Sequence, residues 1–318
     1  MTLAENLHPG VAYVFPGQGS QVVGMGMDLY YNSPAARQVL QETEEALQVP
    51  LRQLLFKGPS EELNKTSIAQ PALLAVSLAC LAAYREEAGS NGGVKPAFVA
   101  GHSLGEYTAL VAAGALRPFD AVRLVKARGR LMQTAAEIRP GGMAAVLGLD
   151  EETVESICRE TGTQISTVNS EDQIVISGER LALARALDLA TARGAKRIMT
   201  LQVSGAFHSE LMEPAREGMA IAIEESEIRT PETPIVANTT GLPLTSPQAI
   251  KQELIDQLCQ PVQWHRSVKF ITGSGVSTFL EFGPGRVLTG LVKRTCREAK
   301  VYNISDIKSM REAVAAIP

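Results

Sequence analysis

Apolar residues recur along this chain in two patterns, as short continuous runs and as longer stretches with helical spacing. The short runs predict strands near 11–15, 97–101, 234–237, 277–282 and 300–304. The longer stretches predict helices near 68–87, 104–113, 118–137, 246–259, 264–273 and 286–297. Strands that alternate with helices are typical of α/β proteins, in which helices pack on a largely parallel sheet.

This pattern changes at Arg139-Pro140-Gly141-Gly142, where proline and glycines interrupt the helical spacing. Strands are then predicted near 143–149, 164–169, 173–177 and 196–203, with helices near 151–161 and 179–192. The order βαββαβ is that of a ferredoxin-like unit. We therefore expect a large α/β-hydrolase-like domain with a parallel sheet core, formed by 1–138 and 205–318, and an inserted ferredoxin-like small domain at 139–204.

The composition is that of an ordinary soluble globular protein. The 318 residues are 45% hydrophobic and 20% charged, and the net charge of −4 argues against general nucleic-acid binding. The apolar run 72–83 is too short to span a bilayer, and the N-terminus lacks the basic start and apolar core of a signal peptide. The four cysteines are far apart and form neither a metal-type spacing nor a disulfide framework. We expect a cytoplasmic protein with no membrane, nucleic-acid or metal partner.

The stretch Gly101-His102-Ser103-Leu104-Gly105 has the form G-x-S-x-G and lies between a predicted strand and a predicted helix. A serine at such a turn exposes its hydroxyl beside the backbone N–H groups of the new helix. The glycines allow the close backbone approach that the turn needs. This geometry suits a nucleophile that forms an acyl ester, and the alternative interpretation is a glycine-lined structural turn.

A nucleophilic serine needs a general base, and the chain has only four histidines, at positions 8, 102, 208 and 265. His208 lies in a loop after the last strand of the inserted unit, and loops at domain junctions often carry catalytic side chains. Any single histidine is by default a surface or capping residue, but the need of Ser103 for a base favours His208. No acid between the two residues stands out as a partner for the imidazole, and a backbone carbonyl could orient the ring instead.

A second glycine-rich turn, Phe15-Pro16-Gly17-Gln18-Gly19, follows the first predicted strand. It has neither the spacing of a phosphate-binding loop nor that of a dinucleotide fingerprint. It is either a flexible strand end or the source of a backbone N–H that joins the N–H of Leu104 in holding an oxyanion.

Together these pieces closely resemble one family, the malonyl-CoA:acyl-carrier-protein transacylases of bacterial fatty-acid synthesis. The resemblance covers about 11–301 and depends mainly on four stretches, at 15–21, 101–107, 205–209 and 282–285, with support from 66–72 and 260–264. It implies that Ser103 accepts the acyl group and that His208 is its base. It further implies that the N–H groups of Gln18 and Leu104 hold the oxyanion, and that the main-chain carbonyl of Gln263 orients His208.

The resemblance also assigns two substrate contacts. Arg128 matches the arginine that grips the free carboxylate of malonate, a task suited to a guanidinium with two parallel donors. Nothing in the local sequence separates Arg128 from Arg123 or Arg130, so by itself each of them would be a solvated cation. Phe207 should crowd the carbon that carries a methyl group in methylmalonyl substrates.

The resemblance implies ping-pong acyl transfer from malonyl-CoA to the phosphopantetheine thiol of acyl carrier protein, with no bound cofactor, by a monomer. Because carrier proteins are acidic, we expect a basic docking patch. The candidates are Arg193, Lys196 and Arg197, or Lys293, Arg294, Arg297 and Lys300. The alternatives are an acyltransferase that serves a polyketide assembly line, a serine acyl-hydrolase, and a non-catalytic scaffold.

Overall fold

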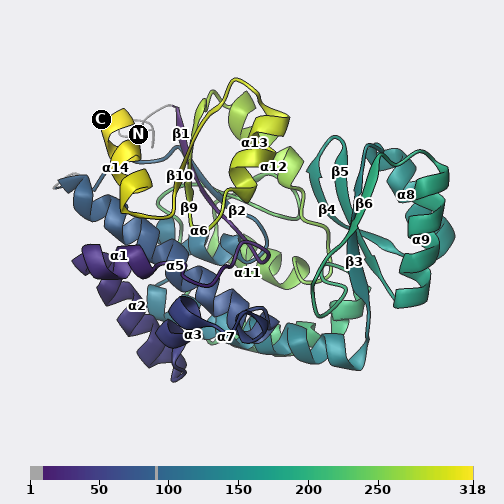
Figure 1. Ribbon diagram of the computed structural model, residues 1–318, viewed down its shortest axis with the longest axis horizontal. Helices are drawn as coiled ribbons and strands as arrows, with labels where there is room; N and C mark the ends of the chain where they lie inside the picture. Colours follow the sequence, from purple (N-terminus) through teal and green to yellow (C-terminus); the bar gives the residue numbers. More distant parts are fainter. Residues whose placement is uncertain (1–9, 90–91, 318) are drawn as a thin grey trace.

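A parallel sheet forms the centre of the larger part of the molecule (Figure 1). The computed structural model describes residues 10–89 and 92–317, so His8 lies outside the described residues. Within them the sheet has six strands in the order β10-β9-β1-β2-β7-β8, and only β8 is antiparallel to its neighbour. The strands are β1 (Val11–Phe15), β2 (Phe98–Gly101), β7 (Ile235–Val236), β8 (Pro243–Leu244), β9 (Thr278–Phe282) and β10 (Lys300–Ile304).

Helices cover both faces of this sheet, because alternate residues of a strand point to opposite sides. Val11, Tyr13 and Phe15 belong to the core on the side of α5, whereas Ala12 and Val14 pack with residues of α12 and α13. The helices on the two faces and at the edges are α1 (Met27–Asn32), α2 (Pro34–Leu47), α3 (Leu51–Lys57), α4 (Ser60–Leu63), α5 (Thr66–Glu87), α6 (Gly105–Ala112), α7 (Pro118–Ile138), α10 (Arg216–Glu224), α11 (Pro247–Asp256), α12 (Trp264–Gly273), α13 (Val287–Thr295) and α14 (Ile307–Ala316), with a 3-10 helix at Glu210–Ala215.

Helix α5 extends beyond the apolar run 72–83 at both ends. Among the described residues it is the one helix that is long and apolar enough to cross a membrane, but 83% of its most apolar stretch is buried inside the protein. It packs against α2 and α7. Helix α5 is therefore a core helix, as its apolar faces predict.

The smaller domain has the predicted βαββαβ order and lies at one end of the molecule (Figure 1). Its elements are β3 (Gly142–Leu147), α8 (Glu151–Thr161), β4 (Gln164–Ser170), β5 (Gln173–Gly178), α9 (Arg180–Ala192) and β6 (Arg197–Thr200). The strands form an antiparallel sheet in the order β4-β5-β3-β6, and its side chains build a separate hydrophobic core with α8 and α9. The predicted fold class is confirmed, and the limits of the two domains at 139 and 204 stay a prediction.

Candidate active site

Ser103 lies at a tight turn between β2 and α6, at the carboxyl ends of the parallel strands β1 and β2. Its φ angle of 53° is in the left-handed region, which a non-glycine residue adopts only when its surroundings hold it there. A Cβ atom on Gly101 would lie 1.9 Å from the carbonyl carbon of Gly105, and one on Gly105 would lie 2.0 Å from the carbonyl oxygen of Phe15. Both glycines of the G-x-S-x-G stretch are therefore required by the packing of this turn.

The turn brings Ser103 to His208, although the two residues are 105 positions apart. The Nε2 atom of His208 lies 2.8 Å from the Oγ atom of Ser103, and its Nδ1 atom lies 2.6 Å from the carbonyl oxygen of Gln257. A carbonyl only accepts, so Nδ1 carries the proton and Nε2 presents its lone pair to the serine hydroxyl. Burial and the charge of Arg128 lower the pKa of His208 to about 3. The imidazole is thus a neutral base at physiological pH.

The expectation that Gln263 supplies the orienting carbonyl is wrong. Gln263 is the N-cap residue of α12, and its carbonyl accepts the N–H of Ser267 at 2.9 Å in the first turn of that helix. Gln257 is the C-cap residue of α11, where a carbonyl has no intrahelical donor. The free carbonyl at the helix end, and not the one at the next helix start, therefore faces His208.

Arg128 projects from α7 and is buried beside the nucleophile, with 1% of its surface exposed. Its Nη1 atom donates to Gln70 Oε1 at 2.8 Å, and its Nη2 atom donates to Gln257 Oε1 at 2.7 Å and to Ser103 Oγ at 3.2 Å. The guanidinium carbon also lies 5.5 Å from the centre of the Tyr107 ring. Burial lowers the pKa of Arg128.

No carboxylate within the described residues forms an ion pair with Arg128, and its Nε atom has no hydrogen-bond partner. A buried cation without a counterion is costly unless a ligand supplies the negative charge. The structure therefore places an anion-binding group within hydrogen-bond distance of the serine hydroxyl.

The two predicted oxyanion donors lie beside Ser103. A Cβ atom on Gly17 would lie 2.4 Å from the carbonyl oxygen of His102, so the chain before Gln18 passes directly against the serine turn. Leu104 is the N-cap residue of α6, where backbone N–H groups lack intrahelical acceptors. Among the hydrogen bonds of the described residues, neither the N–H of Gln18 nor that of Leu104 has a protein acceptor. Both N–H groups are free to bind an oxygen atom of a substrate.

Ser103, His208 and Arg128 line a hollow of about 160 Å³ between the two domains. The large domain contributes Gln18, Ser103, Arg128, Phe207 and His208 to its lining. The small domain contributes Met143 and Val175. This volume is below the ~300–1,000 Å³ of most small-molecule pockets, so only a small group fits inside. Within the described ranges, no group of three or more His, Cys, Asp or Glu side chains is placed to hold a metal ion.

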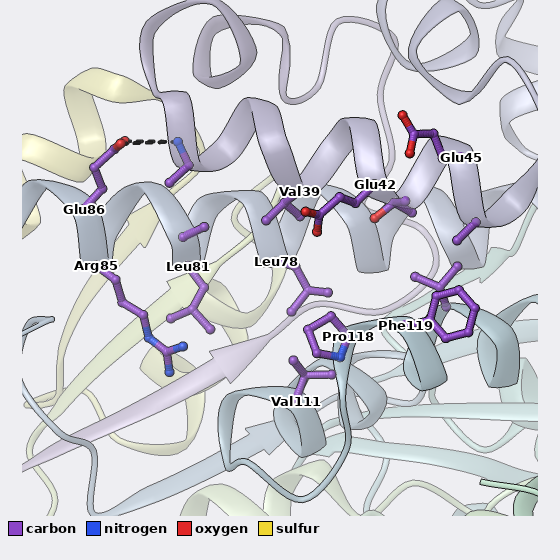
Figure 2. Close-up of a pocket in the computed structure, with 15 residues that line it drawn as sticks. Val39, Glu42, Glu45, Leu78, Leu81, Arg85, Glu86, Val111, Pro118 and Phe119 are labelled. Atoms are coloured by element: carbon purple, nitrogen blue, oxygen red, sulfur yellow. Dashed lines mark hydrogen bonds between the residues drawn. The ribbon is translucent and has the colours of Figure 1, made fainter. Parts of the chain in front are cut away.

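A larger groove, of about 870 Å³, lies elsewhere, between α2, α5 and the start of α7 (Figure 2). Figure 2 shows Leu78 and Leu81 of α5 facing Val39 of α2 and Pro118 of α7 across it. No serine, cysteine or histidine lines this groove. The smaller hollow is therefore the candidate active site.

The two other histidines of the described residues, His102 and His265, form hydrogen bonds with residues other than Ser103. The Nε2 atom of His102 lies 2.8 Å from Asn169 Oδ1, and His102 lines the same hollow as Ser103. The Nδ1 atom of His265 lies 3.1 Å from Thr295 Oγ1.

Three polar residues of the site, Gln70, Asn238 and Gln257, are not predicted from the sequence. Gln70 lies in the 66–72 stretch that supports the resemblance, and this membership is the one signal that could have marked it. Asn238, whose Oδ1 atom accepts the N–H of Ser103 at 2.7 Å, and Gln257 lie in segments without a motif. Their proximity to Ser103 arises only from the fold.

Comparisons with known proteins point the same way as the site. The sequence model of the acyl transferase domain family matches residues 12–314. The malonyl CoA-acyl carrier protein transacylase of Bacillus subtilis (strain 168) is 43% identical over 312 residues, which cover 96% of this chain and 97% of that protein. The enzyme of the same name from Escherichia coli (strain K12) is 44% identical over 307 residues, covering 95% and 98%.

Solved structures show the same similarity. The crystal structure of an acyl-carrier-protein-S-malonyltransferase from Bartonella henselae has a TM-score of 0.93 and 41% identity, covering 97% of this chain and 99% of that one. A malonyl-transacylase in complex with a type II polyketide acyl-carrier protein has a TM-score of 0.93 and 42% identity, covering 96% and 99%.

Proposed function

Because this chain belongs to the acyl transferase domain family over almost its whole length, we propose that Ser103 carries the malonyl group in the reaction. The chain is an acyltransferase that moves malonyl from malonyl-CoA to acyl carrier protein in fatty-acid synthesis. The observation that carries our assignment is that Ser103 Oγ lies within hydrogen-bond distance of both a neutral imidazole and a buried guanidinium.

In the first half-reaction, Ser103 Oγ attacks the thioester carbonyl of malonyl-CoA while His208 Nε2 takes the hydroxyl proton. The N–H groups of Gln18 and Leu104 hold the negative oxygen of the tetrahedral intermediate. The carbon–sulfur bond then breaks, His208 returns the proton to the leaving sulfur, and CoA departs as a thiol. A malonyl ester remains on Ser103.

In the second half-reaction, the phosphopantetheine thiol of the carrier protein gives its proton to His208 and attacks the ester. The same two N–H groups hold the new oxyanion. The ester bond breaks, and Ser103 takes back the proton from His208. The carbonyl of Gln257 keeps the imidazole in one tautomer through both steps.

Substrate choice rests on two side chains. Arg128 holds the malonyl carboxylate, and an acetyl group would leave its buried charge without a partner. Phe207 is 5% exposed and lines the hollow, where it crowds the carbon that bears the methyl group of methylmalonyl. A methyl clash of this kind discriminates by about 1–3 kcal/mol.

The two basic clusters support one carrier-docking surface. From one cluster, Arg294 Nη1 lies 3.8 Å from Asp172 Oδ1 in the β4–β5 turn. The carbonyl of Asp172 accepts the N–H of Gly148. The side chain of Lys196, from the other cluster, packs against Gly148. The two clusters thus meet at the β4–β5 turn. Helix α13, which carries Lys293 and Arg294, also lines the active-site hollow. We propose that an acidic carrier protein docks on this surface around the β4–β5 turn, and that this chain acts as a cytoplasmic monomer.

Release of CoA thiol from malonyl-CoA, measured with and without holo carrier protein, tests this function. We expect at most one equivalent of CoA per enzyme without the carrier, and sustained turnover with it. Sustained release without the carrier would identify an acyl-hydrolase and contradict the proposal.

A further inference from the structure

Glu106 is a fully buried carboxyl three positions after the nucleophile, in the first turn of α6. Its Oε1 atom accepts the backbone N–H of Asn238 at 3.0 Å, and its Oε2 atom accepts the side-chain amide of Gln257. Burial and the charge of Glu253 raise the pKa of Glu106. Both of its partners are donors, which favours the unprotonated carboxylate.

The amide of Gln257 has a single possible orientation. Its Oε1 atom faces Arg128 Nη2, which can only donate, and its Nε2 atom faces the carbonyl oxygen of Ser103 at 3.0 Å, which can only accept. The Nε2 atom also donates to Glu106. Gln257 therefore links the carboxyl of Glu106 to the guanidinium of Arg128.

Asn238 supports the other side of the serine turn. Its Oδ1 atom accepts the N–H of Ser103 at 2.7 Å, and its Nδ2 atom donates to the carbonyl of Gly101 at 2.7 Å. Because Ser103 has a left-handed backbone conformation, these bonds hold it in place. Glu106, which binds the backbone of Asn238, thus supports the nucleophile and the arginine together.

We propose that Glu106 is a positioning residue for malonyl selectivity, which through Gln257 and Asn238 fixes the guanidinium of Arg128 relative to the hydroxyl of Ser103. This inference rests on the roles proposed above for Ser103 and Arg128. The side chain of Gln257 lies between the carboxyl of Glu106 and the guanidinium, so Glu106 fixes the position of Arg128 without forming an ion pair with it. The Nε atom of Arg128 therefore keeps an unused N–H for the substrate, which a direct ion pair could occupy.

The variant Glu106→Gln tests this role with almost no change of shape. The new NH2 group must face either the N–H of Asn238 or the NH2 of Gln257, and both are donors. One hydrogen bond is lost in either orientation. Glu253→Gln is the control for the loss of a nearby buried charge. Glu253 acts on the pKa of Glu106, but its side chain accepts from the N–H and the hydroxyl of Thr239 rather than from Gln257 or Arg128, and that hydroxyl can turn to accept.

The measurement is the kcat/KM for acylation by malonyl-CoA and by acetyl-CoA, followed by rapid quench and intact mass. For Glu106→Gln we expect the malonyl value to fall by about 10- to 100-fold, as for a misplaced binding group. The acetyl value should fall by a clearly smaller factor, because acetyl-CoA uses the serine turn that Asn238 supports but not Arg128. For Glu253→Gln we expect the ratio of the two values to stay within about twofold of the wild type, because the link from Glu106 through Gln257 to Arg128 stays intact. An equal fall for both substrates in Glu106→Gln, or an unchanged ratio, would overturn the proposal.

A second variant covers the case in which Glu106→Gln does not fold. Gln257→Met removes the amide that links Glu106 to Arg128 and keeps the backbone carbonyl that binds His208. We expect the same selective loss with malonyl-CoA, and wild-type selectivity in this variant would contradict the inference. Absence of a malonyl adduct from the wild-type enzyme would instead contradict the proposed function, so the two failures are distinguishable.

Discussion

The Nη2 atom of Arg128 lies 3.2 Å from the Oγ atom of Ser103. In a malonyl thioester a single CH2 group separates the carboxylate from the carbonyl that is attacked. A carboxylate bound to this guanidinium therefore brings the thioester carbon to the serine hydroxyl, and the same contact provides both recognition and orientation.

Replacing this arginine should alter selectivity more than folding. We expect Arg128→Ala to lower kcat/KM for malonyl-CoA by roughly 10- to 100-fold, the loss of a charged hydrogen bond, while acetyl-CoA gains relative to it. Arg130→Ala, on the exposed side of the same helix, is the control and should leave the ratio unchanged. Equal malonyl-to-acetyl ratios in Arg128→Ala and the wild type would remove Arg128 from its role.

The pH dependence of acylation follows from the lowered pKa of His208, which burial and Arg128 bring to about 3. A lowered pKa keeps the base neutral far below the usual value of a histidine. We expect kcat/KM for malonyl-CoA to be flat from about pH 8 to about pH 5 and to fall only in more acidic solution. In Arg128→Ala the acid limb should move to higher pH, because one cause of the shift is gone. A wild-type break near pH 6.5 would refute this account of the base.

The packing of Gly17 makes a prediction about the oxyanion site. A methyl group at this position would lie 2.4 Å from the backbone oxygen of His102, so the segment that carries Gln18 must shift. We expect Gly17→Ala to lower kcat by about 100-fold, the usual effect of losing one oxyanion donor. Gly290→Ala in α13, where the added methyl meets open space, should keep kcat and raise stability by up to ~1 kcal/mol. A wild-type kcat in Gly17→Ala would show that the backbone N–H of Gln18 does not hold the oxyanion.

The docking surface is tested by charge reversal. We expect the double variant Lys293→Glu/Arg294→Glu to raise KM for the carrier protein about fivefold or more at low salt, with a smaller effect on malonyl-CoA. The control is Lys308→Glu/Arg311→Glu, which makes the same charge change on α14. An equal effect of both double variants would mean that only net charge matters, and the proposed surface would be wrong.

Much of the fold can be predicted from local sequence. Helix α8 ends where expected because Asp150 caps its N-terminus and Gly162 ends it in a left-handed conformation. The segment at Glu210–Ala215 and α10 is not predicted, since Pro214 interrupts the helical pattern. Helix α14 lies beyond the resemblance, although its capping box at Asp306 and Ser309 is a local signal.

The site divides in the same way. Ser103 can be predicted because its turn needs glycines at fixed positions, and His208 follows from the small number of histidines. The partner of His208 cannot be predicted from residue type, because any residue supplies a carbonyl and only the end of α11 selects Gln257. Arg128 looks like its solvated neighbours until the fold buries it.

The central claim is that a malonyl ester forms on Ser103, and mass spectrometry after brief incubation with malonyl-CoA tests it most directly. We expect one malonyl adduct on the wild-type protein, mapped by peptide digestion to the stretch that contains Ser103, and no adduct on Ser103→Ala. A malonyl adduct of normal yield on Ser103→Ala would contradict the account.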